Sequence, residues 1–205
     1  MRQSIYPIFF SGLICIAAGI IYWLKKENTQ LSQEKQQLSE IKSNIEKLYL
    51  NIIATQWELE GDTIFMETRL LNQNKDTFTL RDLIGISSKP TFILNFNWDA
   101  CQDCINQEVE LIQQELMGLY NVIVLISFNT LNEYLSYAQS NQTPFPVFHR
   151  TKPPDVDDTL AHDYGVFGFI LTRDGRILFP HVASSSLPEL SRRYYKIITE
   201  KSSTL

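Results

Sequence analysis

Hydrophobic and polar positions follow several distinct patterns along the chain, and the first is a long uncharged stretch. From Gln3 to Leu24 no residue is charged and almost every residue is apolar. At about 1.5 Å per residue, roughly twenty helical residues cross a hydrocarbon core about 30 Å thick. We therefore predict a transmembrane helix within residues 1–26, with Tyr22 and Trp23 as interfacial anchors.

Two other interpretations of this stretch are weaker. A buried core helix would rarely run so far without a polar face. A cleaved signal peptide is the stronger competitor, because Ala17, Ala18 and Gly19 are small residues of the kind that precede a cleavage site. The apolar run continues past them to Leu24, which favours an uncleaved anchor.

A polar stretch with a seven-residue repeat follows, from Glu27 to about Thr55. It has no Gly or Pro and is rich in good helix formers, so it predicts one helix. Residues 27–56 then form a stalk, either a single amphipathic helix, which we favour, or a parallel coiled coil that makes a homodimer. The repeating apolar residues are Leu31, Leu38, Ile45 and Ile52, with Ile41 and Leu48 between them.

Residues 57–205 show the alternation of strand and helix patterns that is typical of an α/β domain. Short alternating or continuous apolar runs predict strands at 63–71, 91–96, 121–127, 145–149, 168–172 and 176–180. Helical spacing predicts helices after Asp99, at 131–139 and at 187–199. This order predicts a central mixed sheet covered on both faces.

The helix after Asp99 has the clearest pattern. Asp99 is expected to cap it, because Gln102 three residues later completes a capping-box pattern. The apolar residues are spaced by four, three and four, which places them on one face. They are Ile105, Val109, Ile112 and Leu116.

Composition narrows the class of function. The 205 residues are 44% hydrophobic and 20% charged, which excludes a disordered chain. The net charge is −5 overall and −7 over residues 57–205, and no Lys or Arg cluster is present, so we expect no nucleic-acid partner. Three cysteines are too few for a disulfide framework.

The only strong chemical signal is Cys101-Gln102-Asp103-Cys104. Close to the start of a helix, Cys101 would lie where free backbone N–H groups and the helix dipole stabilise a thiolate. Such a thiolate attacks disulfides, and Cys104, about one turn further on, can resolve the mixed disulfide that results. We therefore predict both cysteines to be catalytic.

Other roles for the pair are less well supported. A Cys-X-X-Cys pair can be half of a zinc site, but the chain has no second cysteine pair and its histidines show no ligand spacing. We therefore predict neither a metal nor a cofactor. A pair of unreactive core cysteines is also less well supported, because both cysteines would have to fall by coincidence at a helix start directly after a buried strand. His149 and His181 are expected to be hydrogen-bonded structural residues.

The segment from Pro90 to Trp98, followed by Cys101 and Cys104, resembles the strand and active site of thioredoxin-fold proteins, and most closely the TlpA/ResA-like, AhpC/TSA-related, membrane-anchored thiol–disulfide oxidoreductases. The likeness covers roughly residues 76–199 and includes Phe78-Thr-Leu-Arg-Asp-Leu83, Phe145-Pro-Val-Phe148, Tyr164-Gly-Val166 and Phe169-Ile-Leu-Thr-Arg-Asp-Gly175. The resemblance implies a thioredoxin-like domain that acts on protein thiols or disulfides.

Carried over by position, the resemblance makes Cys101 the attacking thiol and Cys104 the resolving one. It places Trp98 at the surface that receives the partner. The family has a cis-proline that faces the cysteines and holds the partner's backbone, and the matching stretch here begins with Val166 and Phe167, without a proline. We therefore predict Trp98, Val166 and Phe167 as substrate-binding residues.

The sequence departs from the family in ways that bear on the direction of exchange. Asp99 and Ala100 separate Trp98 from the cysteines, and the residues between the cysteines include no proline. The carboxylate of Asp103 disfavours the neighbouring thiolate and so raises its pKa. We therefore predict a reductant, nearer to roughly −270 mV than to the roughly −120 mV of a strong oxidase.

Three functions follow as hypotheses. The first is a thiol–disulfide oxidoreductase tethered as a single-pass protein to the inner or cytoplasmic membrane, with its domain outside the cytoplasm, where disulfides persist. The second is a redox-inactive binding or assembly module with a structural disulfide, which the missing cis-proline favours. The third is a thiol peroxidase, for which no suitably placed Thr and Arg are evident.

Overall fold

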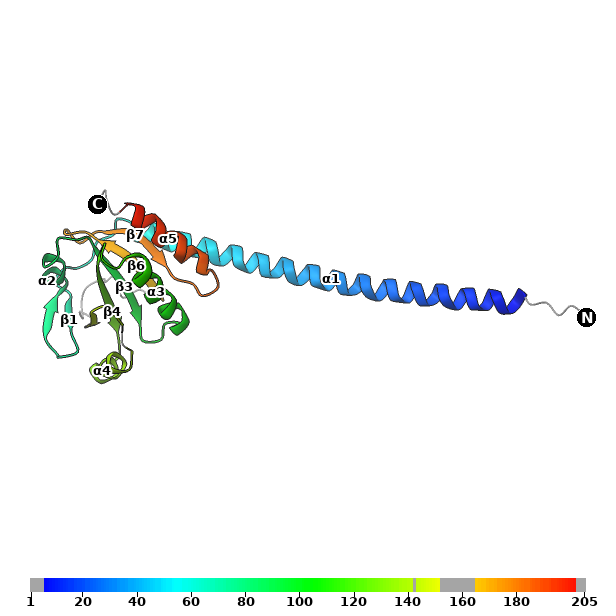
Figure 1. Cartoon of the computed structure of the whole chain (residues 1–205), viewed down its shortest axis with the longest axis horizontal. Coiled ribbons are helices and arrows are strands. Elements are labelled where there is room, and N and C mark those ends of the chain that lie inside the picture. Colours follow the sequence, from blue (N-terminus) through cyan, green and yellow to red (C-terminus); the bar gives the residue numbers. More distant parts are fainter. Residues whose placement is uncertain (1–5, 142, 152–164, 202–205) are drawn as a thin grey trace, which may run out of the picture. The chain divides into compact units, whose positions relative to one another are not determined.

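The computed structural model describes residues 6–141, 143–151 and 165–201, with side chains from residue 18 onward. The chain forms two compact units, residues 1–51 and 52–205, and each is considered by itself. The described residues of the first unit all belong to the helix α1, Tyr6–Leu59 (Figure 1). The predicted domain boundaries at residues 26 and 56 both fall inside this one helix.

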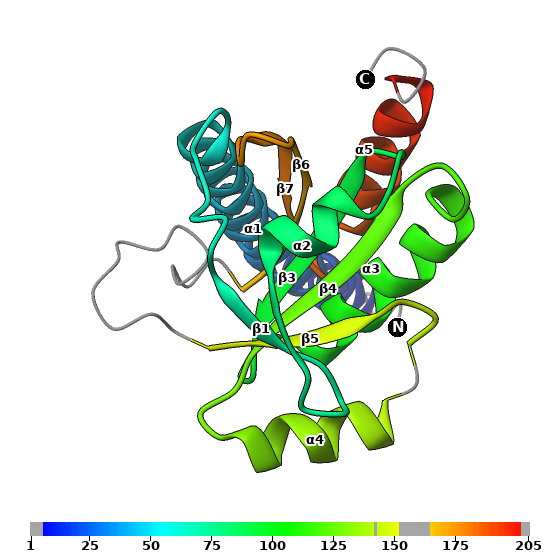
Figure 2. The ribbon, with the colours of Figure 1, turned by 90° about the vertical axis from the view of Figure 1, so that its left-hand side faces the viewer.

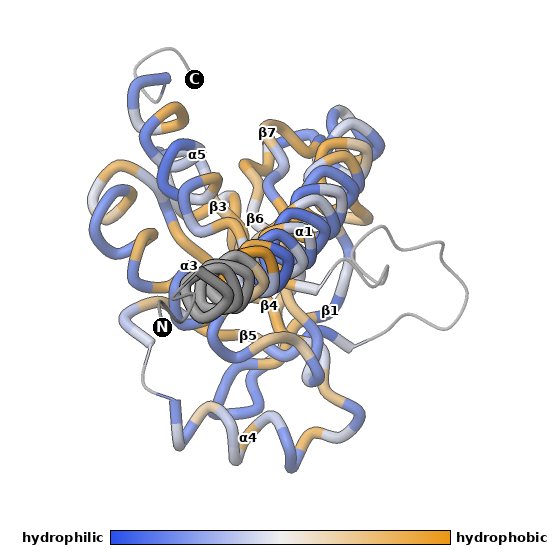
Figure 3. The backbone as a smooth tube through the Cα atoms, turned by 90° about the vertical axis from the view of Figure 1, so that its right-hand side faces the viewer, coloured by the Kyte–Doolittle hydropathy of each residue, from blue (hydrophilic) through white to orange (hydrophobic). Residues whose placement is uncertain are grey.

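The described part of α1 is polar with a recurrent apolar stripe. In Figure 3 its hydrophilic colouring is interrupted repeatedly by hydrophobic residues. Leu31, Leu38, Ile41 and Ile45 are all exposed, Leu31 and Leu38 by about two thirds (65% and 67%). Within the described residues, none of the helices combines the length and the apolar character that a membrane crossing requires. Residues 1–5 and the side chains of residues 6–17 of the predicted anchor lie outside the described part.

The second unit is built on one seven-stranded mixed sheet in the order β2-β1-β5-β4-β3-β6-β7 (Figure 2). β3, β4 and β5 are parallel to one another, and β6 and β7 form an antiparallel hairpin beside β3. The strands are β1 Arg69–Leu71, β2 Thr77–Thr79, β3 Thr91–Asn97, β4 Asn121–Ser127, β5 Val147–Arg150, β6 Val166–Leu171 and β7 Ile177–Val182.

Helices cover both faces of this sheet, as the order of strands and helices in the sequence predicts. Along β3, Phe92, Leu94 and Phe96 pack with α3, α4 and α5, whereas Ile93 packs with α2 and the end of α1 on the other face. Right-handed crossovers place α3 and α4 on the same face, because both connect strands in the same direction. The helices are α2 Leu80–Gly85, α3 Gln102–Glu115, α4 Leu131–Ser140 and α5 Pro188–Lys201.

The structure corrects one predicted strand. Residues 63–71 do alternate, since Ile64 and Met66 are buried while Phe65 is exposed, but only β1, Arg69–Leu71, forms a ladder there. Thr63 makes an isolated bridge to Arg176, and a turn closes between Phe65 and Thr68. Side chains in this segment therefore alternate between buried and exposed, although most of the segment is not paired with another strand. The short β2 and α2 were not predicted.

Candidate functional site

Cys101 and Cys104 form a disulfide at the start of α3, directly after the loop that leaves β3. Their Cα atoms are 5.2 Å apart. The two sulfur-bearing residues differ in access, because Cys101 is exposed and Cys104 is 6% exposed within the core under α3. An incoming sulfur can therefore reach Cys101 but not Cys104, which is the asymmetry that an attacking and a resolving cysteine require.

The helix begins two residues later than predicted, and Asp99 is not its cap. Residues 98–100 form a turn, in which the Ala100 amide donates to the Asn97 carbonyl at 3.1 Å. Cys101 itself is the N-cap, and its sulfur accepts a hydrogen bond from the Cys104 amide at 3.2 Å. The Cys101 sulfur thus occupies the position that capping oxygens usually hold, where the helix dipole favours negative charge.

Trp98 lies at the surface, with 59% of its area exposed. Its amide donates to the Ser127 carbonyl at 2.9 Å, which continues the β3–β4 ladder one residue beyond the end of β3. The backbone before the cysteines is therefore anchored to β4, while the indole ring remains free to meet another molecule.

The other two predicted substrate-binding residues are buried. Val166 pairs with Phe96 near the end of β3 that leads to the cysteines, and its side chain lies on the same face of the sheet as Cys104. Phe167 has no exposed area and points to the opposite face, among the residues that pack on α1 and α2. Only the backbone of this stretch can meet a partner. None of the described peptide bonds is cis, and Gly165, just before β6, has a φ of 72°.

A buried polar cluster, not predicted from the sequence, lies one helical turn from Cys104. Glu108 is 1% exposed and accepts a hydrogen bond from the Tyr195 hydroxyl. His181 Nε2 lies 3.9 Å from a Glu108 oxygen and 2.8 Å from the Ser191 hydroxyl oxygen. The one sign of this cluster in the sequence is that the carboxylate of Glu108 falls between Ile105 and Ile112 on the apolar face of the helix.

Burial controls the protonation of this cluster. It raises the pKa of the Glu108 carboxyl, and the hydroxyls of Ser191 and Tyr195 offset part of that rise. Burial also lowers the pKa of His181 to about 4. A neutral imidazole therefore lies beside Glu108 at neutral pH, and it supplies no positive charge to stabilise the carboxylate.

We expect replacement of Glu108 by Gln to change how stability depends on pH. Because its pKa is raised in the folded state, the stability that Glu108 contributes should be fully present below the ordinary carboxyl pKa and be lost as pH rises through the raised value. Glu108→Gln should remove this decline and so gain stability relative to wild type with rising pH. Urea unfolding of both proteins from pH 4 to 8 checks this, and a pH-independent difference would contradict it.

The two histidines that were predicted to be structural are both buried. His181 contacts Gln56 and Ser191, and His149 stacks on Tyr134 with 5.3 Å between ring centroids. Among the described residues, no group of three His, Cys, Asp or Glu side chains could hold a metal ion. The disulfide between Cys101 and Cys104 supports thiol–disulfide exchange at this site.

Comparisons with known proteins bear on the fold. No family model and no curated protein matches this sequence. Among solved structures, a protein assigned as thiol:disulfide interchange protein DsbE from Chlorobium tepidum has 14% identity and a TM-score of 0.49, covering 68% of this chain and 97% of its own. A thiol:disulfide interchange protein from a Bacteroides species has 9% identity and a TM-score of 0.48, covering 67% and 90%. Peroxidoxin BcpB from Mycobacterium tuberculosis has 14% identity and a TM-score of 0.46, covering 68% and 97%.

The topology itself defines the class. The β3-α3-β4 unit, the β6-β7 hairpin and the closing α5 form a thioredoxin-like fold, with the cysteine pair at the start of α3. The strand order and the order of the elements confirm the thioredoxin-like fold that the resemblance implies.

Proposed function

We propose that this protein is a thiol–disulfide oxidoreductase that acts on protein disulfides through Cys101 and Cys104. The observation that carries the proposal is the asymmetric pair, an exposed residue Cys101 at the N-cap of α3 whose sulfur is bonded to that of a buried Cys104. An inert structural disulfide has no need of an exposed sulfur at a helix start, whereas an exchange reaction does.

The reaction balances as two thiol–disulfide exchanges. The reduced Cys101 thiolate attacks one sulfur of a substrate disulfide, and the other substrate sulfur leaves as a thiolate that takes a proton. Cys104 then loses its proton and attacks Cys101 in the mixed disulfide, which releases the second substrate thiol. Two electrons pass to the substrate, the Cys101–Cys104 disulfide forms, and an external dithiol must reduce it again.

We propose that the protein works as a reductant. Asp99 and Asp103 are exposed beside Cys101, and no Lys or Arg lies between Trp98 and Cys104 to oppose their charge. These carboxylates disfavour a stable thiolate, and a less stabilised reduced form gives a more reducing couple. The full-length protein should therefore reduce insulin with a dithiol donor, and its potential should lie nearer to roughly −270 mV than to roughly −120 mV. A potential near the latter value would contradict the direction.

A redox-inactive binding module is the second candidate. The observation that favours it is the stretch from Gly165 to Phe167, which has no proline and in which the side chains of Val166 and Phe167 are both buried. A structural disulfide would have a potential below roughly −300 mV, and its thiols would resist labelling after mild reduction. Insulin turnover together with ready labelling of Cys101 would exclude this candidate.

We further propose that residues 1–26 tether the domain to the inner or cytoplasmic membrane, with residues 27–56 as a stalk and the domain outside the cytoplasm. The uncharged run from Gln3 to Leu24 supports the tether, and the exposed apolar stripe on α1 supports pairing of two stalks. The full-length protein should stay in the membrane pellet after alkaline carbonate extraction, and cross-linking there should show a dimer. Release by carbonate would contradict the tether, and a monomer would contradict the pairing.

A further inference from the structure

A cavity of about 340 Å³ lies at the end of the sheet opposite to the cysteine pair. Its wall includes Thr91, the first residue of β3, and Leu171, the last residue of β6, which are paired across the ladder. Since β3 rises about 3.3 Å per residue and Cys101 follows its far end, roughly 20 Å of strand separates the cavity from the disulfide. The cavity is therefore distinct from the redox site.

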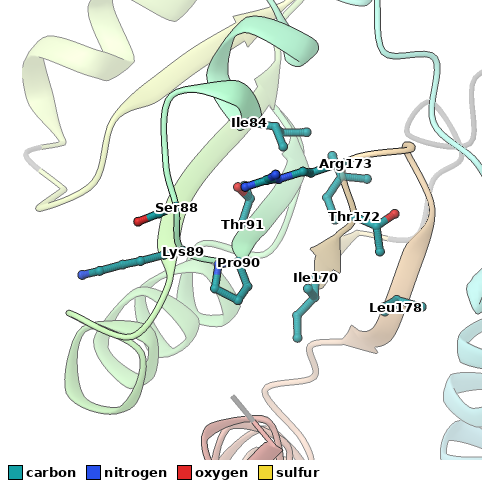
Figure 4. A pocket seen from close by; sticks show the side chains of 10 residues that line it. Ile84, Ser88, Lys89, Pro90, Thr91, Ile170, Thr172, Arg173 and Leu178 are labelled. Carbon is teal, nitrogen blue, oxygen red and sulfur yellow. The ribbon is translucent and has the colours of Figure 1, made fainter. Parts of the chain in front are cut away.

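The lining combines an apolar wall with hydroxyl groups and positive charge. It includes Lys89 and Arg173 and no acidic residue, although residues 57–205 carry a net charge of −7. In Figure 4 the guanidinium of Arg173 extends between Ile84 and Thr91, whereas the Lys89 side chain points away from it. The apolar wall consists of Ile84, Pro90, Ile170, Leu171 and Leu178, and the hydroxyls are those of Ser88, Thr91 and Thr172.

No carboxylate among the described residues neutralises either cation at the cavity. The nearest acid in sequence, Asp174, is engaged by Arg176, whose Nε lies 3.0 Å from a carboxylate oxygen. Lys89 donates from Nζ to the Gly118 carbonyl at 2.6 Å, which leaves its charge without a counter-ion. The described contacts include no ion pair for Arg173. A positive group with spare donors therefore lies over an apolar wall.

The turn that carries Arg173 is held in one shape. The Thr172 amide donates to the Arg176 carbonyl at 3.0 Å, and the Arg176 amide donates to the Thr172 hydroxyl at 2.8 Å. Gly175 takes the left-handed conformation, with a φ of 87°, that a three-residue hairpin loop needs. The backbone at Arg173 is thus preorganised, which reduces the entropy cost of binding a ligand.

We propose that this cavity binds a small organic carboxylate with an apolar body. The planar guanidinium of Arg173 matches the two oxygens of a carboxylate, and the Thr91 hydroxyl beside it offers a further donor. The apolar wall that includes Pro90, Ile170 and Leu178 fits the body of such a ligand, and the volume is within the range of small-molecule sites. This site does not depend on the proposed redox activity.

Binding of benzoate to the full-length protein in detergent, measured by equilibrium dialysis, tests the proposal. Wild type should bind benzoate saturably, and Arg173→Gln should weaken binding at least about tenfold. Arg193→Gln is the matched control, because Arg193 is exposed on α5 and outside the cavity, and the loss of charge is identical. Benzamide, a neutral molecule of the same shape, should bind at least about tenfold more weakly than benzoate.

Three outcomes would overturn the site. They are the absence of saturable benzoate binding by wild type, equal binding of benzoate by Arg173→Gln and Arg193→Gln, and binding of benzamide that is as tight as that of benzoate. Because Arg173 is exposed, Arg173→Gln is expected to fold, and a urea-unfolding midpoint equal to that of wild type confirms that its domain is intact. If wild type does not reduce insulin, that result contradicts the redox proposal, and the benzoate measurements still test the cavity.

Discussion

Replacing Cys101 with Ser should reduce insulin turnover to the uncatalysed background, whereas replacing Cys104 with Ser should trap a covalent complex with the substrate. Cys101 is the exposed residue of the pair and Cys104 is buried, so without Cys101 no accessible thiol remains to attack the substrate. Without Cys104, the mixed disulfide on Cys101 has no neighbouring sulfur to release it. Turnover assays and non-reducing gels of the two variants measure these effects.

Cys15 offers a matched control for this pair. It is the third cysteine of the chain, and it lies in α1 within the predicted anchor, far in sequence from the other two. Cys15→Ser should therefore turn over insulin as wild type does and should trap nothing. Turnover that survives in Cys101→Ser, or a complex that forms equally well in Cys101→Ser and Cys104→Ser, would contradict the assigned roles.

Adding a single methyl group at Gly168 should destabilise the domain by roughly 1–3 kcal/mol. A Cβ built on Gly168 would lie 2.6 Å from Cζ of Phe92, which is closer than real Cβ contacts come. Phe92 has no exposed area and packs against Tyr120 and Tyr195, so its ring has little room to move. Urea unfolding of Gly168→Ala measures the loss.

Two comparisons separate this clash from a general effect of glycine replacement. Gly85, in the last turn of α2, has open space where a Cβ would lie, so Gly85→Ala should be neutral or slightly stabilising. In a Phe92→Leu background the ring is absent, and Gly168→Ala should cost less than it does in wild type. An equal cost in both backgrounds would show that the ring is not the cause.

Much of the fold was predictable because the patterns that specify it are local. The continuous apolar run from Val122 to Ile126 is the signature of a strand buried on both faces, and β4 spans Asn121–Ser127. The Arg173-Asp174-Gly175 turn predicted a hairpin, which β6 and β7 form. The strand predicted at 63–71 was wrong over most of its length. Its alternation of apolar and polar residues reflects burial alone, whereas a ladder also needs a partner strand.

The candidate site was predictable in part. Spacing and position identified Cys101 and Cys104, but the sequence assigned the cap to Asp99, because Asp is a strong capping residue and the competing turn at 98–100 has no sequence signature of its own. Phe167 was predicted as substrate-binding from the family position, yet period-two alternation turns its side chain to the far face of the sheet.

By itself, the sequence determined the α/β order of elements, the cysteine pair beside a helix start and the polar helix before the domain, since each depends on residues a few positions apart. Only the tertiary structure decided that Cys104 is buried while Cys101 is not, that Glu108 meets His181 and Tyr195, and that Arg173 lies beside Thr91. The physical reason is that these contacts join distant segments, and strand pairing and helix packing across the whole domain bring those segments together.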